Sequence, residues 1–342
     1  MRCIYFRIFE ILTLFSLQKF LIIRFSSIGD IVLTTPVVRC IKLQFPEAEI
    51  HFLTKEKFYP VLKANPYITK VHTFQDDMGP LIGSLKDQDF DFIVDLHKNL
   101  RSARVKIALR KASGTFSKLN LQKWLLVNLK INRLPALHIV DRYFHAVEKL
   151  GIKNDNQGLD YFIPEDDNLG HDDLLQYFHE EFIAFVIGGL HHTKMFPEER
   201  IIELCQMIDK PIILLGGPDD REKAERIIAA CDNEIMNGCG QFSINQSAAI
   251  IKMSSKVITN DTGLMHIAAA FRKEIISFWG NTIPAFGMSP YLPMGEGSSD
   301  IFEVKDLPCR PCSKIGYDKC PKKHFKCMMD IELKAVLDKV KT

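Results

Sequence analysis

Short polar motifs directly after apolar, strand-like runs are the parts of this chain best suited to chemistry. The first is SSIGD, Ser26 to Asp30, which follows the run LIIRF. In open α/β sheets, ligands bind at the carboxyl ends of the strands. Asp30 is therefore a candidate general base, with Ser27 and Gly29 beside it in the same loop. The alternative is that Asp30 only caps the helix that begins there.

A second motif, Asn260 to Gly263, follows the run KVIT and precedes the helical stretch LMHIAAAF. A helix N-terminus offers unpaired N–H groups and partial positive charge, which suit a diphosphate, and Gly263 allows close approach. Thr262 can donate a hydroxyl hydrogen bond, and His266 lies one turn into the helix. Asp261 would repel phosphates, so sugar hydroxyls suit it better. The alternative is an Asp261 N-cap with His266 packed in the core.

Two more loops follow strand-like runs. Lys194 comes after FIAFVI, next to Thr193, where a lysine can neutralise charge on a departing diphosphate. The segment LLGGPDDRE places Gly217 after another strand, with Asp220 and Glu222 available to accept hydrogen bonds from ribose hydroxyls. The same G-G-P-D string is also ordinary turn chemistry. The SSIGD loop lacks G-x-G-x-x-G, which argues against a dinucleotide-binding dehydrogenase.

Asp87, Asp89 and Asp91 contain the D-x-D string that metal-dependent transferases use to hold a nucleotide diphosphate. Here the string precedes its strand, DFIVDL, instead of following it. A solvated loop between a helix and a strand is therefore the favoured interpretation.

Strands and helices must position these loops. Apolar runs alternate with amphipathic helical stretches along the chain, which predicts the α/β class with parallel sheets. We expect strands at 21–25, 49–53, 70–74, 91–96, 182–187, 211–215, 234–237, 256–259 and 274–278. We expect helices at 37–43, 102–109, 198–207, 220–230, 245–253 and 264–271, and a long helical region at 121–150.

Two domains are expected from a length of 342 residues. A segment rich in Gly, Asp and Asn, residues 151–173, is typical of an interdomain connection. We therefore expect an extension at 1–18, an N-terminal domain at 19–165 and a C-terminal domain at 166–342.

Charge is balanced overall, since 44 Lys and Arg face 42 Asp and Glu. A nucleic-acid partner is therefore not expected. One basic block stands out: residues 98–133 hold ten Lys or Arg and no Asp or Glu. Such a block attracts phosphates or an anionic membrane face, and the alternative is a solvated helical surface.

Nine cysteines without a secretory signal indicate a reducing compartment, with the cytoplasm as the expectation. The apolar first 17 residues are interrupted by Arg7 and Glu10 and are too short to cross a bilayer. They fit an interfacial helix or an extension from an upstream start. Near the other end, a structural Zn²⁺ site is a candidate, although the second spacing is irregular; its four thiols are Cys309, Cys312, Cys320 and Cys327.

Taken together, RFSSIGDIVLTTP and NDTGLMHIAAA resemble the two signature regions of glycosyltransferase family 9, the ADP-heptose heptosyltransferases. The resemblance continues through HHTKMFPEE, LLGGPDDRE and the cysteine-bearing tail, and covers essentially Lys19 to the end. One departure is Phe196, where the family often has Trp. The resemblance implies the GT-B architecture, in which two Rossmann-like domains face a cleft. The first domain would bind the acceptor and the second the nucleotide-sugar.

The resemblance also implies roles for residues. Asp30 matches the family's catalytic base and Lys194 the lysine that meets the nucleotide-sugar. We expect donor contacts from Asp261, Thr262, Gly263, His266, Thr193, Gly217 and Glu222, and acceptor contacts from Ser27, Gly29, Lys98, Arg101 and Arg104. Family members invert the anomeric centre and need no catalytic metal, so no cofactor is expected for catalysis.

The expected function is transfer of a heptose from ADP-heptose to the phosphorylated inner core of lipopolysaccharide. The basic block would dock this acceptor at the cytoplasmic face of the inner membrane, with Trp124, Leu125 and Leu126 touching the lipid surface. Two alternatives remain: a GT-B-type sugar-nucleotide epimerase and a non-catalytic binding protein with the same fold. Product analysis separates the first, and the presence of Asp30, Lys194 and Asp261 together weighs against the second.

Overall fold

The computed structural model describes residues 17–169 and 181–342, which form two compact units. The first unit comprises the chain up to Lys118 together with Ile139–Gln157, and the second comprises Leu119–His138 and Gly158–Thr342. The division after Gln157 therefore falls within the connection expected at 151–173 but before the boundary expected at residue 165, and a segment of the basic block groups with the second unit. The proposals for residues 1–16 lie outside the described residues.

The first unit is built on one parallel sheet, confirming the expected class. Within the described residues it has five strands in the order β3-β2-β1-β4-β5. They are β1 (Lys19–Ile23), β2 (Glu49–Lys55), β3 (Lys70–Phe74), β4 (Phe92–Asp95) and β5 (Ala112–Thr115). The central strand β1 is apolar from Phe20 to Ile23 because helices cover both of its faces.

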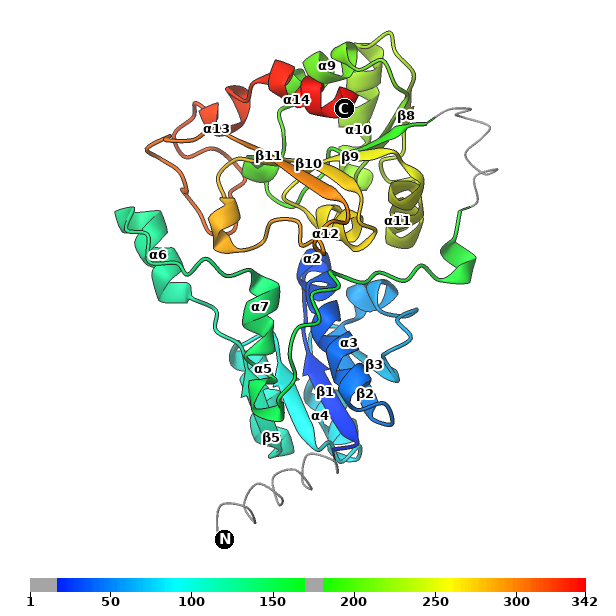
Figure 1. Ribbon diagram of the computed structural model, residues 1–342, viewed down its shortest axis with the longest axis vertical. Coiled ribbons are helices and arrows are strands. Elements are labelled where there is room, and N and C mark those ends of the chain that lie inside the picture. The colour runs from blue at the N-terminus through cyan, green and yellow to red at the C-terminus, as the bar shows by residue number, and fades with distance from the viewer. Residues whose placement is uncertain (1–16, 170–180) are drawn as a thin grey trace. The chain divides into compact units, whose positions relative to one another are not determined.

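Helices cover this sheet in two layers (Figure 1). They are α2 (Ile28–Val32), α3 (Thr35–Gln44), α4 (Gly79–Lys86), α5 (Leu100–Leu109) and α7 (Ile139–Phe144), with short 3₁₀ turns at Glu56–Val61 and Glu148–Leu150. Leu85 of α4 and Val105 of α5 pack with Leu21 and Ile23 on one face. On the other face α3 packs beside α7.

The second unit repeats this plan with a larger sheet. Its described part has six parallel strands in the order β11-β10-β9-β6-β7-β8. They are β6 (Ile183–Val186), β7 (Ile212–Leu215), β8 (Ile235–Asn237), β9 (Lys256–Asn260), β10 (Glu274–Trp279) and β11 (Ser298–Glu303). Numbered within the unit, this is the strand order of a dinucleotide-binding fold.

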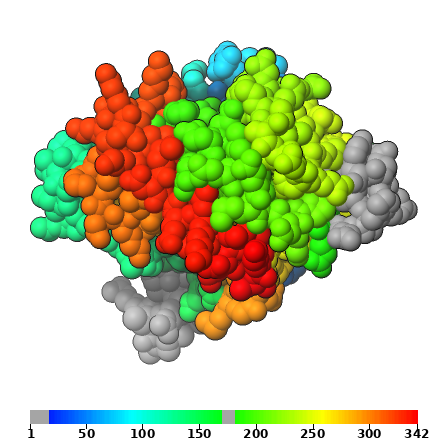
Figure 2. Space-filling model, turned by 90° about the horizontal axis from the view of Figure 1, so that it is seen from above, coloured from blue at the N-terminus to red at the C-terminus, as the bar shows by residue number. Residues whose placement is uncertain are grey.

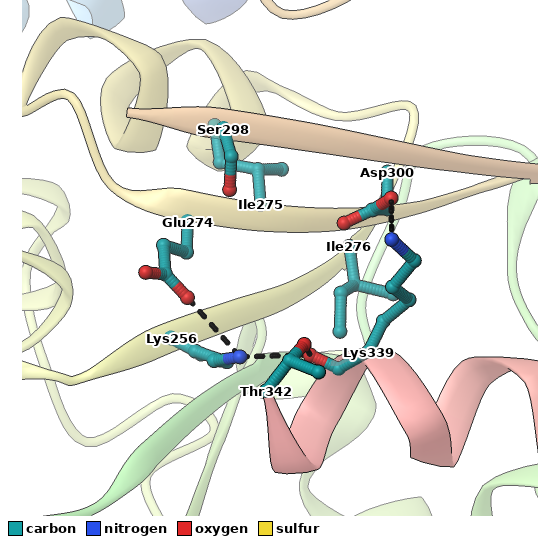
Figure 3. A pocket seen from close by; sticks show the side chains of 8 residues that line it. All are labelled: Lys256, Glu274, Ile275, Ile276, Ser298, Asp300, Lys339 and Thr342. Atoms are coloured by element: carbon teal, nitrogen blue, oxygen red, sulfur yellow. Dashed lines mark hydrogen bonds and ion pairs between the residues drawn. The ribbon is translucent and has the colours of Figure 1, made fainter. Parts of the chain in front are cut away.

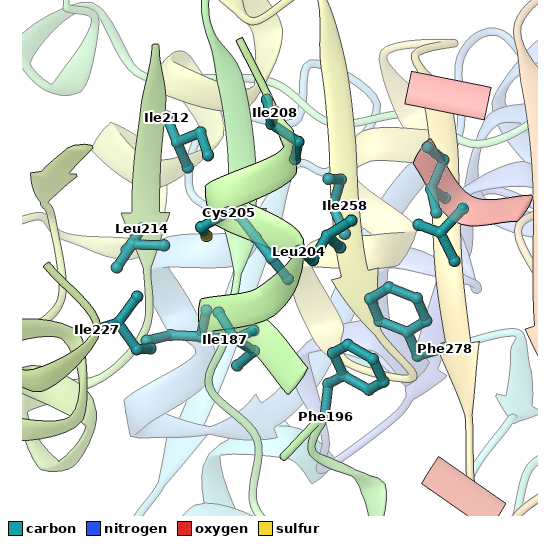
Figure 4. Close-up of a cluster of buried hydrophobic side chains, with 14 of the residues drawn as sticks. Ile187, Phe196, Leu204, Cys205, Ile208, Ile212, Leu214, Ile227, Ile258 and Phe278 are labelled. Atoms are coloured by element: carbon teal, nitrogen blue, oxygen red, sulfur yellow. The ribbon is translucent and has the colours of Figure 1, made fainter. Parts of the chain in front are cut away.

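The helices of the second unit are α6 (Asn120–Leu129), α9 (Glu198–Met207), α10 (Arg221–Ala229), α11 (Ile244–Met253), α12 (Gly263–Ala270), α13 (Lys326–Met329) and α14 (Leu333–Lys341), with 3₁₀ turns at Glu165–Asp167, His192–Lys194, Pro218–Asp220 and Pro284–Phe286. The C-terminal helix α14, red in Figure 2, lies beside α9. Between α9 and the sheet lies an apolar core in which Phe196 stacks on Phe278 at 4.0 Å (Figure 4).

One expected element is wrong: the long helical region at 121–150 is interrupted. Helix α6 ends at Leu129, and α7 begins only at Ile139. Lys130 ends α6 with a left-handed φ of 59°. Pro135 then disfavours helix on both sides, since it lacks an N–H and restricts the preceding residue.

No helix among residues 17–169 and 181–342 combines the length and the apolar character that crossing a bilayer requires.

Candidate functional site

Each sheet reverses its strand order at a point of its own, and candidate loops follow the strands at that point. The reversal falls between β1 and β4 in the first sheet and between β6 and β9 in the second. Ligands of open α/β sheets bind outside the carboxyl ends of the strands at such points. The SSIGD loop follows β1, the Lys194 loop follows β6, and the NDTG loop follows β9.

Asp30 lies in α2 immediately after β1 and is held from both carboxylate oxygens. Its Oδ1 pairs with Nη2 of Arg24 at 2.6 Å. Its Oδ2 accepts the backbone N–H of Ser27 at 3.1 Å and the Ser27 hydroxyl at 2.9 Å. Asp30 thus takes part in the capping box of α2 with Ser27, and this contact does not by itself decide whether it also acts as a base. Gly29 is buried beside it.

Arg24 fixes this carboxylate in turn. Its other guanidinium nitrogens donate to the carbonyls of Ser26 at 2.8 Å and Leu96 at 2.6 Å. Burial alone would raise the pKa of Asp30, but the nearby guanidinium and the Ser27 hydrogen bonds outweigh it and lower that pKa. Asp30 is therefore an oriented, ionised carboxylate, able to accept a proton from a hydroxyl that takes the place of Ser27.

The loop after β4 carries the basic residues expected to bind an acceptor. Asp95, which is 1% exposed, accepts the backbone N–H groups of His97 and Lys98 at 3.0 and 2.7 Å. These bonds hold Lys98 at the start of α5. Arg101 and Arg104 are exposed on α5.

The two loops at the reversal point of the second sheet are tied together by Asn260. Its side-chain oxygen accepts the backbone N–H of Phe196 at 2.9 Å. Its amide nitrogen donates to the backbone carbonyls of Val186, Ile187 and Gly188 at 3.3 to 3.4 Å. Asn260 is fully buried, so it joins the end of β9 to the loop that follows β6.

Lys194 and Asp261 come from these two loops and form an ion pair. Lys194 Nζ lies 2.5 Å from Asp261 Oδ2, and the two side chains are 20% and 9% exposed. Thr282, after β10, donates its hydroxyl to the same oxygen at 3.0 Å. The pair combines a cation for phosphate oxygens with a carboxylate for hydroxyls at the carboxyl edge of the sheet.

The N-terminus of α12 completes this edge. Thr262, not Asp261, precedes the first residue of the helix, so an Asp261 N-cap is wrong. Gly263 opens the helix, and its neighbour Thr262 is partly exposed. His266 is 2% exposed, as the core-packing alternative predicts.

The remaining donor-side residues are placed unequally. Thr193 is 1% exposed, and its hydroxyl bonds the backbone of Tyr317. Gly217 donates its N–H to Asp220 Oδ2 at 2.9 Å, so this carboxylate holds its own turn. Glu222 is exposed in the first turn of α10.

The basic block is divided between the two units. Residues up to 118 belong to the first unit and residues 119–133 to the second. Leu126 is 7% exposed and packed, which corrects its expected lipid contact, whereas Trp124 is 53% exposed. Leu100 and Ile107 on α5 are 91% and 74% exposed.

The D-x-D string binds the protein's own groups. Asp91 Oδ2 accepts the backbone N–H groups of Gln18 and Lys19, each at 2.8 Å, and Asp89 pairs with Lys111 at 2.5 Å. The structural interpretation of this loop is therefore confirmed.

The four cysteines of the tail lie near one another, since burial and then the thiols of Cys312, Cys320 and Cys309 raise the pKa of Cys327. No group of three or more His, Cys, Asp or Glu side chains within the described ranges is arranged to hold a metal ion. Cys309 Sγ lies 3.8 Å from His324 Nε2, and the four thiols are free. As placed, these side chains do not fit a zinc ion.

A cavity of about 230 Å³ opens at the opposite edge of the second sheet (Figure 3). It is lined by the first residues of three strands, Lys256, Glu274 and Ser298, and by Lys339 of α14. Lys256 donates to the Lys339 carbonyl at 2.7 Å and pairs with Glu274 at 3.1 Å. These bonds anchor the C-terminal helix, and the amino ends of strands are not where such folds bind nucleotides.

Three buried polar residues at the site escaped the sequence reasoning as site residues: Arg24, Asp95 and Asn260. Arg24 and Asp95 each come directly after three apolar residues, in LIIRF and DFIVDL, and Asn260 ends the run KVITN. A charge or an amide in such a run is a usable signal, because burial of a polar group is unfavourable unless it is paired.

The chain is similar to known heptosyltransferases in sequence and fold. Residues 78–318 match the profile of glycosyltransferase family 9 (heptosyltransferase). Lipopolysaccharide heptosyltransferase 1 of Campylobacter coli is 25% identical over 296 residues, which cover 78% of this chain and 84% of that protein.

Two solved structures from E. coli share the fold. ADP-heptose lipopolysaccharide heptosyltransferase II has a TM-score of 0.70 and 21% identity, covering 95% of this chain and 98% of that one. Heptosyltransferase WaaC with ADP has a TM-score of 0.66 and 18% identity, covering 95% and 99%. The two parallel-sheet α/β domains thus have the GT-B architecture, and the chain belongs to glycosyltransferase family 9, the heptosyltransferase family.

Proposed function

We propose that this glycosyltransferase moves a heptose from ADP-heptose to an inner-core lipopolysaccharide acceptor, with inversion and without a catalytic metal. Family membership supports the reaction class. The observation that carries the proposal is the Lys194–Asp261 pair at the reversal point of the second sheet, beside the N-terminus of α12. A relative of the same fold was solved with ADP.

On the donor side, the diphosphate of the nucleotide-sugar would lie at the start of α12, where Gly263 and the helix N–H groups face it. Lys194 would exchange part of its bond with Asp261 for a phosphate oxygen. Negative charge develops on ADP as the bond from the anomeric carbon to the phosphate oxygen breaks. A lysine that binds this charge stabilises the transition state more than the ground state.

On the acceptor side, Asp30 would remove the proton of the attacking sugar hydroxyl. The hydroxyl oxygen bonds to the anomeric carbon on the face opposite to ADP, which inverts that centre. The proton passes to Asp30, and the electron pair of the broken bond leaves with ADP. Arg24 keeps Asp30 ionised before the proton arrives.

The acceptor would be held by Lys98, Arg101 and Arg104, since cations at the carboxyl end of β4 attract a phosphorylated sugar. The exposed Leu100 and Ile107 on α5 accompany these charges. We propose that this face contacts the anionic surface of the inner membrane. Charge reversal of Arg101 and Arg104 should weaken cosedimentation with anionic vesicles, and unchanged binding would count against this contact.

Turnover measured as ADP release tests the chemistry. We expect Asp30→Asn and Lys194→Ala each to lower kcat by about 100-fold or more, since each removes a group that acts in the transition state. Lys210→Ala is the control, because Lys210 forms an exposed pair with Glu181 away from the site. Near-wild-type turnover of Asp30→Asn would refute the base assignment.

The donor can be identified by thermal unfolding in the presence of ADP-, GDP-, UDP- and CMP-sugars. A ligand that binds only the folded chain raises its melting temperature, and the stabilisation grows with the logarithm of ligand concentration divided by Kd. Selective stabilisation by ADP-heptose supports the proposal. Stabilisation by a uridine or guanosine sugar instead would assign another donor.

A structural zinc in the cysteine tail remains a separate proposal that the reaction does not need. Zinc would require the thiols of Cys309, Cys312, Cys320 and Cys327 to converge from their described positions. Elemental analysis of the purified protein decides it: one zinc per chain supports the site, and none refutes it.

A further inference from the structure

The tail segment, residues 310–317, contacts the loop that carries Lys194 and the turn after β10, whose Thr282 bonds Asp261. Its first contact is Arg310, whose side chain is 6% exposed. The guanidinium donates to the carbonyl of Trp279, the last residue of β10, at 3.1 Å and to two carbonyls of the turn after it, Gly280 at 2.6 Å and Thr282 at 3.1 Å. Glu303 at the end of β11 accepts from the same group at 2.8 Å. Arg310 thus fixes the turn from several sides.

That turn reaches the donor site through Thr282. Arg310 accounts for the position of the Thr282 backbone, and the Thr282 hydroxyl donates to Asp261 Oδ2 at 3.0 Å. The same oxygen pairs with Lys194. A shift of the turn would therefore move or release the Asp261 carboxylate.

The second contact is between Tyr317 and Thr193, the residue before Lys194. The Thr193 backbone N–H and hydroxyl both donate to the Tyr317 carbonyl at 3.1 Å, and the Tyr317 N–H donates to the Thr193 hydroxyl at 2.8 Å. Gly316 lies so close that an added Cβ would be 2.5 Å from Cβ of His191. Its φ of 143° also disfavours other residues.

The two contacts are joined through Asn281. Its backbone N–H donates to the Thr193 carbonyl at 3.5 Å, and its carbonyl accepts the N–H of Cys312 at 3.3 Å. The turn after β10, the loop after β6 and the tail segment therefore form one hydrogen-bonded unit.

We infer that the tail segment positions Lys194 and Asp261 for donor chemistry, with Arg310 as the central positioning residue. The inference rests on the proposed role of Lys194. Arginine suits this task because its rigid fork presents five N–H donors, whereas a lysine ammonium cannot span three carbonyls and a carboxylate at once. The acceptors around Arg310 are mostly backbone carbonyls, so its bonds fix the main chain of the turn and not only a side chain.

Arg310→Lys tests this, since it keeps the charge and most of the volume. We expect kcat with ADP-heptose and an inner-core acceptor to fall by about 10- to 100-fold, as small misplacements of reacting groups do. The Kd for ADP, measured by calorimetry, should change less than about threefold, because Lys194 acts mainly in the transition state. Arg272→Lys is the control, as Arg272 is 41% exposed and pairs with Glu296 before β10. It should match wild type in both measurements.

A double-mutant cycle separates positioning from plain destabilisation. In a background that carries both Lys194→Ala and Asp261→Asn, Arg310→Lys should lower kcat less than about threefold further, because both groups that it positions are already altered. A full additional loss would overturn the inference while leaving the role of Lys194 intact. Near-wild-type turnover of Lys194→Ala alone would instead refute the proposed function.

Gly316→Ala serves if Arg310→Lys does not fold. The added methyl group would clash with His191 and disturb the contact between Tyr317 and Thr193. This variant should therefore also have a lower kcat with nearly unchanged ADP binding. Unchanged kcat in a folded Gly316→Ala protein would overturn the inference.

Discussion

Replacement of Arg24 by Met should destabilise the first unit and change how Asp30 titrates. The two side chains are 9% and 21% exposed, and their nearest atoms lie 2.6 Å apart. Met fills much of the space but leaves the Asp30 carboxylate with the hydrogen bonds from Ser27 only. Breaking a buried pair costs about 3–5 kcal/mol of unfolding free energy. Partial exposure of Asp30 reduces the expected loss to about 2–3 kcal/mol.

The pH dependence has a definite sign. The pKa of Asp30 is lowered in the folded chain. The Arg24–Asp30 pair therefore stabilises the folded chain fully at pH values above the unfolded-state pKa of about 3.9. This contribution is lost as the pH falls through the lowered folded value. Without Arg24, burial is opposed only by Ser27, and the pKa of Asp30 rises. The acid limb of kcat/KM, which reports the free enzyme's base, should therefore move to higher pH.

The assay is ADP release at subsaturating substrate over about pH 4 to 8, alongside thermal unfolding. Arg39→Met is a matched control: Arg39 pairs with Asp155 at 2.8 Å in the same unit, with exposures of 7% and 23%. It should lose comparable stability without moving the acid limb. If Arg24→Met loses stability but keeps the wild-type acid limb, Asp30 is not the titrating base.

Two stability predictions concern the first unit. Burial lowers the pKa of His72 from 6.5 to about 4 in the folded chain. Below pH 6.5 the imidazole is therefore protonated in the unfolded chain but stays neutral in the folded chain until the pH approaches 4, which favours unfolding. The melting temperature should fall as the pH is lowered below 6.5, and it should fall less steeply in His72→Gln. Parallel plots of melting temperature against pH for wild type and variant would contradict this. Gly114→Ala places a Cβ 1.7 Å from a backbone carbonyl oxygen and should cost more than about 2 kcal/mol, whereas Gly83→Ala meets nothing within 4 Å and should gain about 0.5 kcal/mol. Denaturant unfolding of both variants checks the order, which a tolerated Gly114→Ala would reverse.

Most of the fold could be predicted because the strands that position the site are apolar runs of the right length between helical stretches. The two strands that were missed lack this pattern. Strand β5 is Ala-Ser-Gly-Thr, and β11 begins with Ser-Ser-Asp, so neither forms an apolar run. Both pair at sheet edges, where the neighbouring strand supplies the hydrogen bonds. Tertiary pairing decided these two strands.

Site residues could be predicted singly but not as pairs. Lys194 and Asp261 were each assigned a ligand, yet the structure joins them to each other. Thr193 was expected at the nucleotide-sugar, yet its hydroxyl bonds Tyr317, far along the chain. Sequence position states which loop a residue is in. Which distant loop packs against it depends on strand order, which local patterns do not contain.

The buried polar residues at strand ends locate the site independently of any family. Arg24, which follows β1, and Asp95 and Asn260, which end β4 and β9, are each at most 8% exposed. An apolar residue there would avoid the unfavourable burial of a charge or an amide, so stability alone does not explain them. All three bond the backbone of loops at the reversal points: Ser26 and Leu96, His97 and Lys98, and Phe196 with the end of β6. These residues fix the geometry of the loops before a ligand binds. Transfer to a sugar hydroxyl requires such preorganised loops.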